Sequence, residues 1–315
     1  MGVDDLKKVL VTGGAGFIGS NLVKELLNTH HAVTIIDNLS TGNLDNLKNL
    51  SIEFIKGDLL DDTLNLRKIF KGADEVYHLA ANADVRDGWK HPRLDFEQNT
   101  LATVRVLEAC AESKVSHLIF SSTGSVYGEV RERPTSENVL PPGQTSLYGA
   151  SKLAAEGFIQ AYAEANKFTA TIFRFVSVLG PNYSHGHVID FVRKLLQNPK
   201  SLEVLGDGLQ KKSYMHVADC VRGVTEIRGA GKCEIFNLGF NDFCEINDSV
   251  RWITETLGAK PVLTYSGGDR GWVGDNPFIW LDTSKATLHG WKPKFTIRES
   301  IIETTLWLKR SLTSK

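Results

Sequence analysis

The stretch that decides the fold runs from Lys8 to Asn28 and reads KVLVTGGAGFIGSNLVKELLN. An apolar run comes first, glycines follow at Gly13, Gly16 and Gly19, and an amphipathic helical pattern comes last. Glycines at this spacing allow a tight turn and a close approach of the backbone, so a pyrophosphate can reach the free N–H groups and positive dipole of the helix start. The stretch therefore predicts a dinucleotide-binding loop, with a merely structural turn as the alternative.

Short apolar runs alternate with helical patterns through the next part of the chain. Strands that are buried on both faces of a parallel sheet read as such continuous runs. The sequence therefore predicts an α/β protein with a Rossmann-type doubly wound parallel sheet. The expected strands are 8–13, 32–38, 52–59, 75–81, 117–124 and 170–178, and the expected helices include 20–28, 99–114 and 148–167.

Glycines and prolines interrupt this pattern from about Leu179 onward. We expect a smaller C-terminal substrate-binding lobe there, built from about 178–213 and 240–315. Residues 1–177, together with about 214–239, would then form the dinucleotide-binding domain.

The composition favours a protein that acts on a small molecule. The chain has 315 residues, 42% of them hydrophobic, and a formal net charge of -1, which gives no electrostatic case for nucleic acid or an anionic membrane. The four cysteines form no CxxC pair, so we expect reduced core thiols. The first apolar run is broken by glycines, so we expect neither a signal peptide nor a membrane span, and a cytoplasmic protein. No metal site is predicted.

Asp37 ends the second expected strand, 18 residues after Gly19. A carboxylate at this place can accept both ribose hydroxyls of an adenosine, and it would repel a 2′-phosphate. No Arg or Lys lies between Asp37 and Lys48. The sequence therefore favours NAD over NADP, with a strand-end turn as the alternative role for Asp37. Asp58 is expected near the adenine, with a helix cap as its alternative.

Tyr148 and Lys152 are four residues apart in SLYGASKLAAE, which carries helix formers and small residues. Positions i and i+4 share one face of a helix, so the phenol and the ammonium project together. An adjacent ammonium and a positive nicotinamide ring both favour the phenolate, which makes the pair a tunable acid and base. Surface packing is the alternative for this spacing alone.

Taken together, these motifs resemble the extended short-chain dehydrogenase/reductase family, and within it the nucleotide-sugar 4-epimerases. The resemblance covers nearly the whole chain, through TGGAGFIGS, DNLSTG, GDLLD, HLAA, SSTGSVYG, YGASK, RFVSVLGP, LGDGLQKKSYMHVAD and LDTSKATLHGW. It implies that Tyr148 is the base and that Lys152 binds the nicotinamide ribose and lowers the pKa of Tyr148. Thr123, 25 residues before Tyr148, would bind the sugar hydroxyl, with Ser121 and Ser122 as rival hydroxyls.

The resemblance also implies the remaining contacts. Besides the three glycines, Tyr148 and Lys152, the NAD contacts would be Phe17, Ile18, Asp37, Asn38, Asp58, Leu59, Leu79, Ala80, Ala81, Asn99, Ser121, Phe175 and Val178. The substrate contacts would be Thr123, Ser125, Tyr148, Ser177, Lys212 and Arg270. The helices at 99–114 and 148–167 carry apolar residues on more than one face, and in the family this pair forms a homodimer interface.

Three positions depart from the family pattern. Ser177 stands where the family often has an Asn that touches the substrate, and Lys212 stands where it usually has an Arg. A Lys cannot make the bidentate phosphate contact of an Arg. Arg270 is the expected diphosphate clamp, although its register is shifted by two residues, and a solvated loop Arg is the alternative.

Gly124 and Ser125 follow the active-site hydroxyl, at the place where sugar dehydratases and decarboxylases generally carry an acid. With this missing acid, the resemblance implies a UDP-hexose 4-epimerase of the UDP-glucose/UDP-galactose type that works through a transient 4-keto sugar. The alternatives are a 4-ketosugar reductase or other nucleotide-sugar oxidoreductase and, less favoured, a non-enzymatic NAD sensor. The sequence distinguishes neither the sugar nor the nucleotide.

Overall fold

The computed structural model describes residues 6–86, 88–140, 143–272 and 274–313. Within these ranges, seven strands form a parallel sheet in the order β11-β6-β5-β4-β1-β2-β3. Their bounds are β1 Lys8–Thr12, β2 Ala32–Asp37, β3 Glu53–Lys56, β4 Glu75–His78, β5 His117–Thr123, β6 Thr169–Phe175 and β11 Cys233–Leu238. This is the predicted doubly wound parallel sheet, and all of the expected strands are present.

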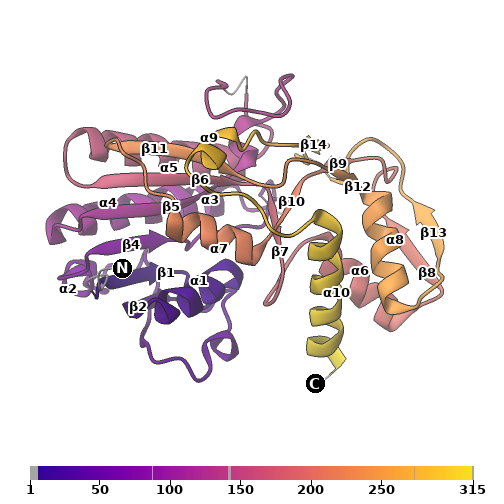
Figure 1. The fold of residues 1–315 in the computed structure, drawn as a ribbon, viewed down its shortest axis with the longest axis horizontal. Helices are drawn as coiled ribbons and strands as arrows, with labels where there is room; N and C mark the ends of the chain where they lie inside the picture. Colours follow the sequence, from indigo (N-terminus) through magenta and orange to yellow (C-terminus); the bar gives the residue numbers. More distant parts are fainter. Residues whose placement is uncertain (1–5, 87, 141–142, 273, 314–315) are drawn as a thin grey trace.

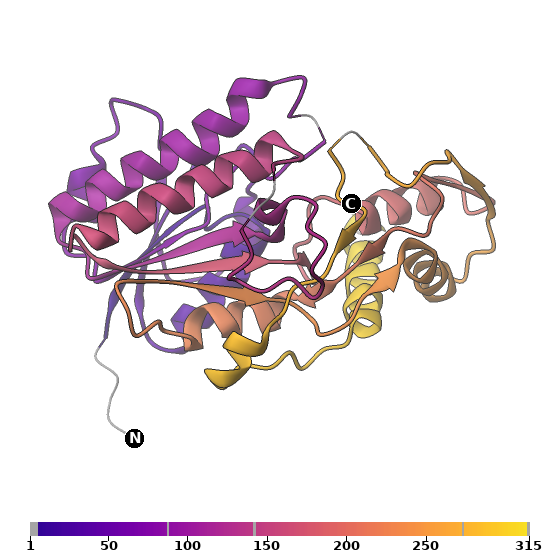
Figure 2. The same cartoon turned by 90° about the horizontal axis from the view of Figure 1, so that it is seen from above.

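Helices cover both faces of the sheet (Figures 1 and 2). On one side lie α1 (Phe17–Asn28) and α7 (Val217–Glu226); on the other lie α2 (Leu66–Phe70), α4 (Ala102–Ser113) and α5 (Leu147–Glu164). Strand side chains alternate between the two sides, so Val9 and Val11 join one buried cluster and Leu10 joins the other. Burial on both faces explains why the strands read as continuous apolar runs.

The expected strand at 170–178 is divided at Val176. Its second part, β7 (Ser177–Leu179), leaves the large sheet and pairs in parallel with β10 (Tyr214–His216). The backbone N–H of Val176 still donates to the carbonyl oxygen of Leu238 at 3.1 Å. The chain therefore turns away from the sheet at this residue and enters the C-terminal part of the molecule.

That C-terminal part lies beside the carboxyl ends of the strands, on the right of Figure 1. Within the described residues it contains two short strand pairs, a small sheet in the order β12-β9-β14, and three longer helices. The bounds are α6 His187–Gln197, β8 Ser201–Val204, β9 Lys211–Lys212, β12 Cys244–Glu245, α8 Ile246–Leu257, β13 Val262–Tyr265, β14 Phe278–Ile279 and α10 Ile297–Thr313. The short helix α9 (Ser284–Leu288) packs against β11 of the large sheet, on the left of Figure 1.

The helix expected at 99–114 begins earlier and is not uniform. It starts as α3 (Pro92–Asp95), continues through the π-helical turn η2 (Phe96–Leu101) and then becomes α4. Pro92 suits the first turn because its missing N–H would have no helical partner. The π turn carries Asn99, and such turns are frequent at functional sites.

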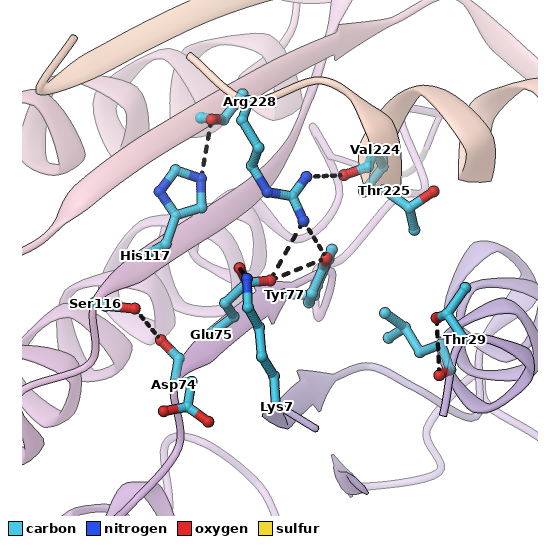
Figure 3. A network of polar contacts seen from close by, with 12 residues as sticks. Lys7, Thr29, Asp74, Glu75, Tyr77, Ser116, His117, Val224, Thr225 and Arg228 are labelled. Carbon is cyan, nitrogen blue, oxygen red and sulfur yellow. Dashed lines mark hydrogen bonds and ion pairs between the residues drawn. The ribbon is translucent and has the colours of Figure 1, made fainter. Parts of the chain in front are cut away.

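Ion pairs connect neighbouring segments at the opposite edge of the sheet, where the amino ends of the strands lie (Figure 3). The Glu75 carboxylate accepts from Lys7 at 2.8 Å and from Arg228 at 3.3 Å. Arg228 also donates to the phenol oxygen of Tyr77 at 2.8 Å. These contacts join the segment that follows α7 to strand β4, far from the carboxyl edge where ligands bind in such sheets.

All four cysteines are free, as expected; three are buried and Cys233 is half-buried. Burial raises the pKa of the Cys233 and Cys244 thiols to about 12, so both are inert thiols at neutral pH. Across the described residues, no helix is long and apolar enough to cross a membrane. In the same residues, no cluster of His, Cys, Asp and Glu has the arrangement of a metal site.

Candidate active site

Helix α5 presents Tyr148 and Lys152 one turn apart, at the carboxyl edge of the sheet. The hydroxyl of Ser146 caps the helix by accepting from the backbone N–H of Gly149 at 3.0 Å. A Cβ at Gly149 would lie 2.7 Å from the carbonyl oxygen of Ser125, so only glycine lets the helix pack this closely. Lys152 is 2% exposed, and its ammonium lies 4.1 Å from the centre of the Phe120 ring.

The Thr123 hydroxyl, at the end of β5, lies near enough to the Tyr148 phenol to lower its pKa as a hydrogen-bond partner would. The rival hydroxyls are directed elsewhere: Ser121 donates to the carbonyl oxygen of His78 at 3.2 Å, and Ser122 donates to the Glu156 carboxylate. Thr123 also accepts from the backbone N–H of Ser125 at 3.1 Å. This geometry favours Thr123 over Ser121 and Ser122 as the partner of the phenol.

The environment of Tyr148 and Lys152 shifts both pKa values. Burial raises the pKa of Tyr148 to about 12; the hydrogen bond with Thr123 lowers it, and the charge of Asp95 raises it. Burial lowers the pKa of Lys152 to about 7, and the charge of Glu156 raises it. Burial therefore favours the protonated phenol of Tyr148 and weakens the charged form of Lys152.

The glycine loop has the shape that a pyrophosphate requires. Gly13 has a φ of +71°, and a Cβ there would lie 2.7 Å from the backbone nitrogen of Ala80. A Cβ at Gly19 would lie 2.2 Å from the carbonyl oxygen of Gly13. Helix α1 begins after Gly16 without a side-chain cap, so the first N–H groups, of Phe17 and Ile18, are available to a phosphate. The loop therefore fits the pyrophosphate of a dinucleotide.

Asp37 lies beside this loop at the end of β2. Its carboxylate accepts from the backbone N–H of Ala15 at 2.9 Å and of Leu39 at 2.8 Å, and each oxygen keeps a lone pair for a ribose hydroxyl. Asn38 donates to Asp58 at 2.8 Å, which brings these two expected cofactor residues together. Asp58 closes a local turn and caps no helix, because α2 begins only at Leu66.

Other residues expected near the cofactor also lie along the carboxyl edge. Asn99 donates to the hydroxyl of Ser151 on α5 at 2.9 Å and accepts from the backbone N–H of Asn82 at 2.8 Å. These bonds hold the segment after β4 against the start of α5. The remaining expected contacts follow the ends of their strands: Leu59 after β3, Leu79, Ala80 and Ala81 after β4, Phe175 at the end of β6, and Val178 in β7.

The two cations expected to bind the substrate have anionic partners. The Lys212 ammonium, on β9, donates to Asp275 at 2.8 Å. Burial lowers the pKa of Lys212, and Asp275 raises it. Arg270 pairs with Glu129 at 2.6 Å, which joins its loop to the segment after β5. Ser177 is exposed at the start of β7.

The structure also places residues that sequence reasoning missed. Asp95 is 1% exposed and accepts from Asn82 at 2.9 Å, and burial raises its pKa. Glu156 is on the same face of α5 as Lys152, one turn further on, and it pairs with Arg174. The repeated spacing of Tyr148, Lys152 and Glu156 was a signal that could have identified Glu156. No comparable signal marked Asp95.

A contact between loops near the site was also missed. Arg86, in the loop after β4, pairs with Asp190 on α6 at 3.0 Å. Its guanidinium carbon lies 5.7 Å from the centre of the Trp272 ring. The loop after β4 is thereby joined to two segments of the C-terminal part.

Comparison with known proteins agrees with this geometry. Residues 9–239 match the model of the NAD dependent epimerase/dehydratase family. A putative UDP-glucose 4-epimerase of Methanocaldococcus jannaschii is 33% identical over 308 residues, covering 96% of this chain and 99% of the relative.

Two solved structures are also similar. The UDP-glucose 4-epimerase of Thermotoga maritima with UDP-glucose has a TM-score of 0.89 and 31% identity, covering 97% of this chain and 99% of that chain. The UDP-glucuronic acid 4-epimerase of Bacillus cereus with UDP-glucuronic acid and NAD has a TM-score of 0.87 and 31% identity, covering 96% and 99%. With a glycine loop that fits a pyrophosphate, NAD is the cofactor, and the chain belongs to the NAD dependent epimerase/dehydratase family.

Proposed function

We propose that this protein is an NAD-dependent 4-epimerase of a UDP-hexose, of the UDP-glucose/UDP-galactose type, that works through a transient 4-keto sugar. The observation that carries the proposal is the set of Thr123, Tyr148 and buried Lys152 at the carboxyl edge of the sheet. The similar proteins that are named as UDP-glucose 4-epimerases support the same reaction.

In the proposed mechanism, the Thr123 hydroxyl orients the C4 hydroxyl of the sugar against the Tyr148 oxygen. The Tyr148 phenolate takes the hydroxyl proton, and Lys152 stabilises the phenolate and holds the nicotinamide ribose. When bound, NAD would supply the reversible hydride acceptor for C4. The 4-keto sugar would turn over in the site so that the hydride returns to the opposite face of C4, while Tyr148 gives its proton back to the C4 oxygen.

The surroundings of Gly124 support an epimerase over a dehydratase or decarboxylase. An acid directly after Thr123 would be needed to protonate a leaving group in those reactions. A Cβ at Gly124 would lie 3.3 Å from Ile279 and 3.4 Å from Leu281, so a longer acidic side chain would be crowded there. Ser125, the next residue, has a hydroxyl that accepts from Thr123 at 3.2 Å and carries no acid.

The C-terminal part is proposed to bind the nucleotide sugar, with the domain division at about residues 178–213 and 240–315. Lys212 and Arg270 would contact the diphosphate, exchanging part of their interaction with Asp275 and Glu129 for phosphate oxygens. Ser125 and Ser177 would contact the sugar. A homodimer and a cytoplasmic location remain predictions.

A panel of UDP-sugars, followed by NMR, tests the proposal. The purified protein should carry NAD and invert C4 of a neutral UDP-hexose without added cofactor and without a net change in nicotinamide absorbance. A requirement for stoichiometric reduced cofactor would favour the 4-ketosugar reductase. Reversible NAD binding with no turnover of any sugar in the panel would favour the NAD sensor.

A further inference from the structure

The buried charge next to the active-site lysine belongs to Glu156. Tyr148, Lys152 and Glu156 follow one another at four-residue spacing, so they share one face of α5. Lys152 is 2% exposed and Glu156 1% exposed. Among the described contacts, no ion pair joins Lys152 to Glu156, so the carboxylate acts on the ammonium through space rather than by direct contact.

Three hydrogen bonds hold the Glu156 carboxylate in place. Arg174, on β6, donates to both oxygens, at 3.0 Å and 2.6 Å, in a bidentate pair. Ser122, on β5, donates to one of them at 2.5 Å. Ser122 and Arg174 are register partners across β5 and β6, so two neighbouring strands hold one residue of the helix. Thr123 directly follows Ser122, so the same contact fixes the strand that carries the substrate-binding hydroxyl.

Arg174 is itself held from its far side. Its guanidinium carbon lies 4.6 Å from the centre of the Tyr127 ring. The Tyr127 hydroxyl donates to Asn237 at 2.8 Å, and Asn237 donates to the carbonyl oxygens of Thr135 and Asp282. A chain of buried polar contacts therefore runs from the active-site helix to the segment before α9.

The other groups that face Lys152 do not explain why its side chain would remain charged. The Phe120 ring, from β5, offers only a cation–π contact at 4.1 Å. His78, from β4, is neutral because burial, together with the charge of Lys152, lowers its pKa to about 3. Tyr148 is protonated in the free protein. Glu156 is the carboxylate that raises the pKa of Lys152 against the effect of burial.

We infer that Glu156, clamped by Arg174 and Ser122, is a positioning residue whose buried carboxylate favours the charged form of the Lys152 side chain beside Tyr148. The ion pair with Arg174 offsets the cost of burying the Glu156 carboxylate. The catalytic meaning of this role rests on the proposed function. The electrostatic effect on Lys152 does not rest on the proposed function, because it is present before any substrate binds.

The direct test is NMR of the full chain with lysines labelled at Cε, whose shift follows ammonium titration. The signal that is lost in Lys152→Met identifies Lys152. In Glu156→Gln, the Lys152 transition should move to lower pH by roughly one unit, since an opposite charge close to a titrating group shifts its pKa by about 1–3 units. An unchanged transition would overturn the inference.

Two further variants separate charge from packing. Ser122→Ala removes a hydrogen bond to the same carboxylate without a change of charge, so the Lys152 transition should stay where it is in the wild type. An equal shift in Ser122→Ala would overturn the inference. Where Glu156→Gln does not fold, the double variant Glu156→Gln/Arg174→Met removes the whole ion pair, a change that proteins often tolerate. It should still lower the transition; a wild-type value there would overturn the inference.

Activity gives a second measurement. With Lys152 neutral at the pH where Tyr148 must ionise, the phenolate is less stabilised, so the acid limb of the rate profile of Glu156→Gln should move to higher pH. A uniform loss of rate at every pH would indicate only a structural role. The NMR titration needs no sugar, so it can succeed even where the proposed epimerase reaction fails, and the reverse is also true.

Discussion

At the scale of single residues, the site depends on a phenol that burial makes a weak acid. Burial raises the pKa of Tyr148 to about 12, and the Thr123 hydroxyl lowers it only in part. A charged Lys152 one turn away on α5 would favour the phenolate further. The positive nicotinamide ring adds a second favourable charge when NAD is bound. Proton transfer at C4 therefore depends on the cofactor and the lysine being in place together.

The first prediction concerns the phenol. Tyr148→Phe should lower turnover of the UDP-sugar by roughly 10²–10⁴-fold, the usual contribution of one general base, while NAD binding persists. Tyr162→Phe is the matched control, because it removes a phenol oxygen from the same helix, where Tyr162 stacks on Phe168. It should keep wild-type turnover. Steady-state kinetics by NMR checks both variants, and wild-type activity in Tyr148→Phe would reject Tyr148 as the base.

The second prediction concerns cofactor choice. Asp37→Ala combined with Asn38→Arg should weaken NAD binding by roughly 10- to 100-fold, the effect of losing one or two hydrogen bonds to a charged group, and should admit NADP. Asp45→Ala, an exposed change in the same loop region, should leave both affinities unchanged. Calorimetry measures the four affinities. If the wild type already binds NADP as tightly as NAD, the assignment of Asp37 to the ribose is wrong.

Residues with local signals could be predicted from the sequence. The glycine spacing and the four-residue spacing of Tyr148 and Lys152 depend only on local backbone geometry, so they could be read directly. The pair of Glu156 and Arg174 could not, because it joins a helix to a strand 18 positions later and depends on the register of β5 and β6. The ion pairs of Lys212 and Arg270 depend on loop conformation, which no spacing encodes.

At the scale of the elements, the contacts at the amino edge of the sheet stabilise the fold rather than serve the reaction. Glu75 begins β4 and is 5% exposed. Burial raises its pKa, but the hydrogen bond from Lys7 and the charge of Arg228 outweigh that effect, and the net shift is downward. A carboxylate with a lowered pKa stabilises the folded state above its unfolded pKa, and this contribution is lost as the pH falls through the folded value.

The third prediction follows from the downward shift of the Glu75 pKa. Glu75→Gln should lower the free energy of unfolding by about 1–3 kcal/mol at neutral pH, because it removes hydrogen bonds to a charged group. The difference from the wild type should shrink as the pH falls below about 4. Glu53→Gln, at the exposed start of β3, should change stability by less than about 0.5 kcal/mol. Urea denaturation across pH measures this, and a difference that grows in acid would contradict it.

The elements themselves were largely predictable because they repeat a simple pattern. Apolar runs of strand length between amphipathic helices define a doubly wound sheet. Two details were not predictable. The break at Val176 depends on β7 finding β10 as a partner, and the π turn at Asn99 depends on the contacts of that residue with Ser151 and Asn82. Both are tertiary effects that act on a locally uniform pattern.

At the scale of the whole molecule, α4 and α5 lie side by side on the outside of the sheet (Figure 2). Along this face, large apolar side chains remain in contact with water: Phe96 is 55% exposed, Leu101 40% and Phe158 45%. Single exposed apolar residues are normal, but several on adjacent helices mark an interaction site. A second copy of the chain would bury this face in a four-helix bundle around a two-fold axis.

The last prediction is that this face forms a homodimer. Phe158→Glu should convert the protein into a monomer of 34.8 kDa at micromolar concentration. A two-fold axis places the substituted residue of both copies in the interface, so two charges would be buried in an apolar contact. Leu288→Glu is the matched control, since Leu288 is 86% exposed on α9, away from both helices. It should leave the assembly unchanged. Sedimentation equilibrium distinguishes the species, and a wild type that sediments only as a monomer would reject the dimer.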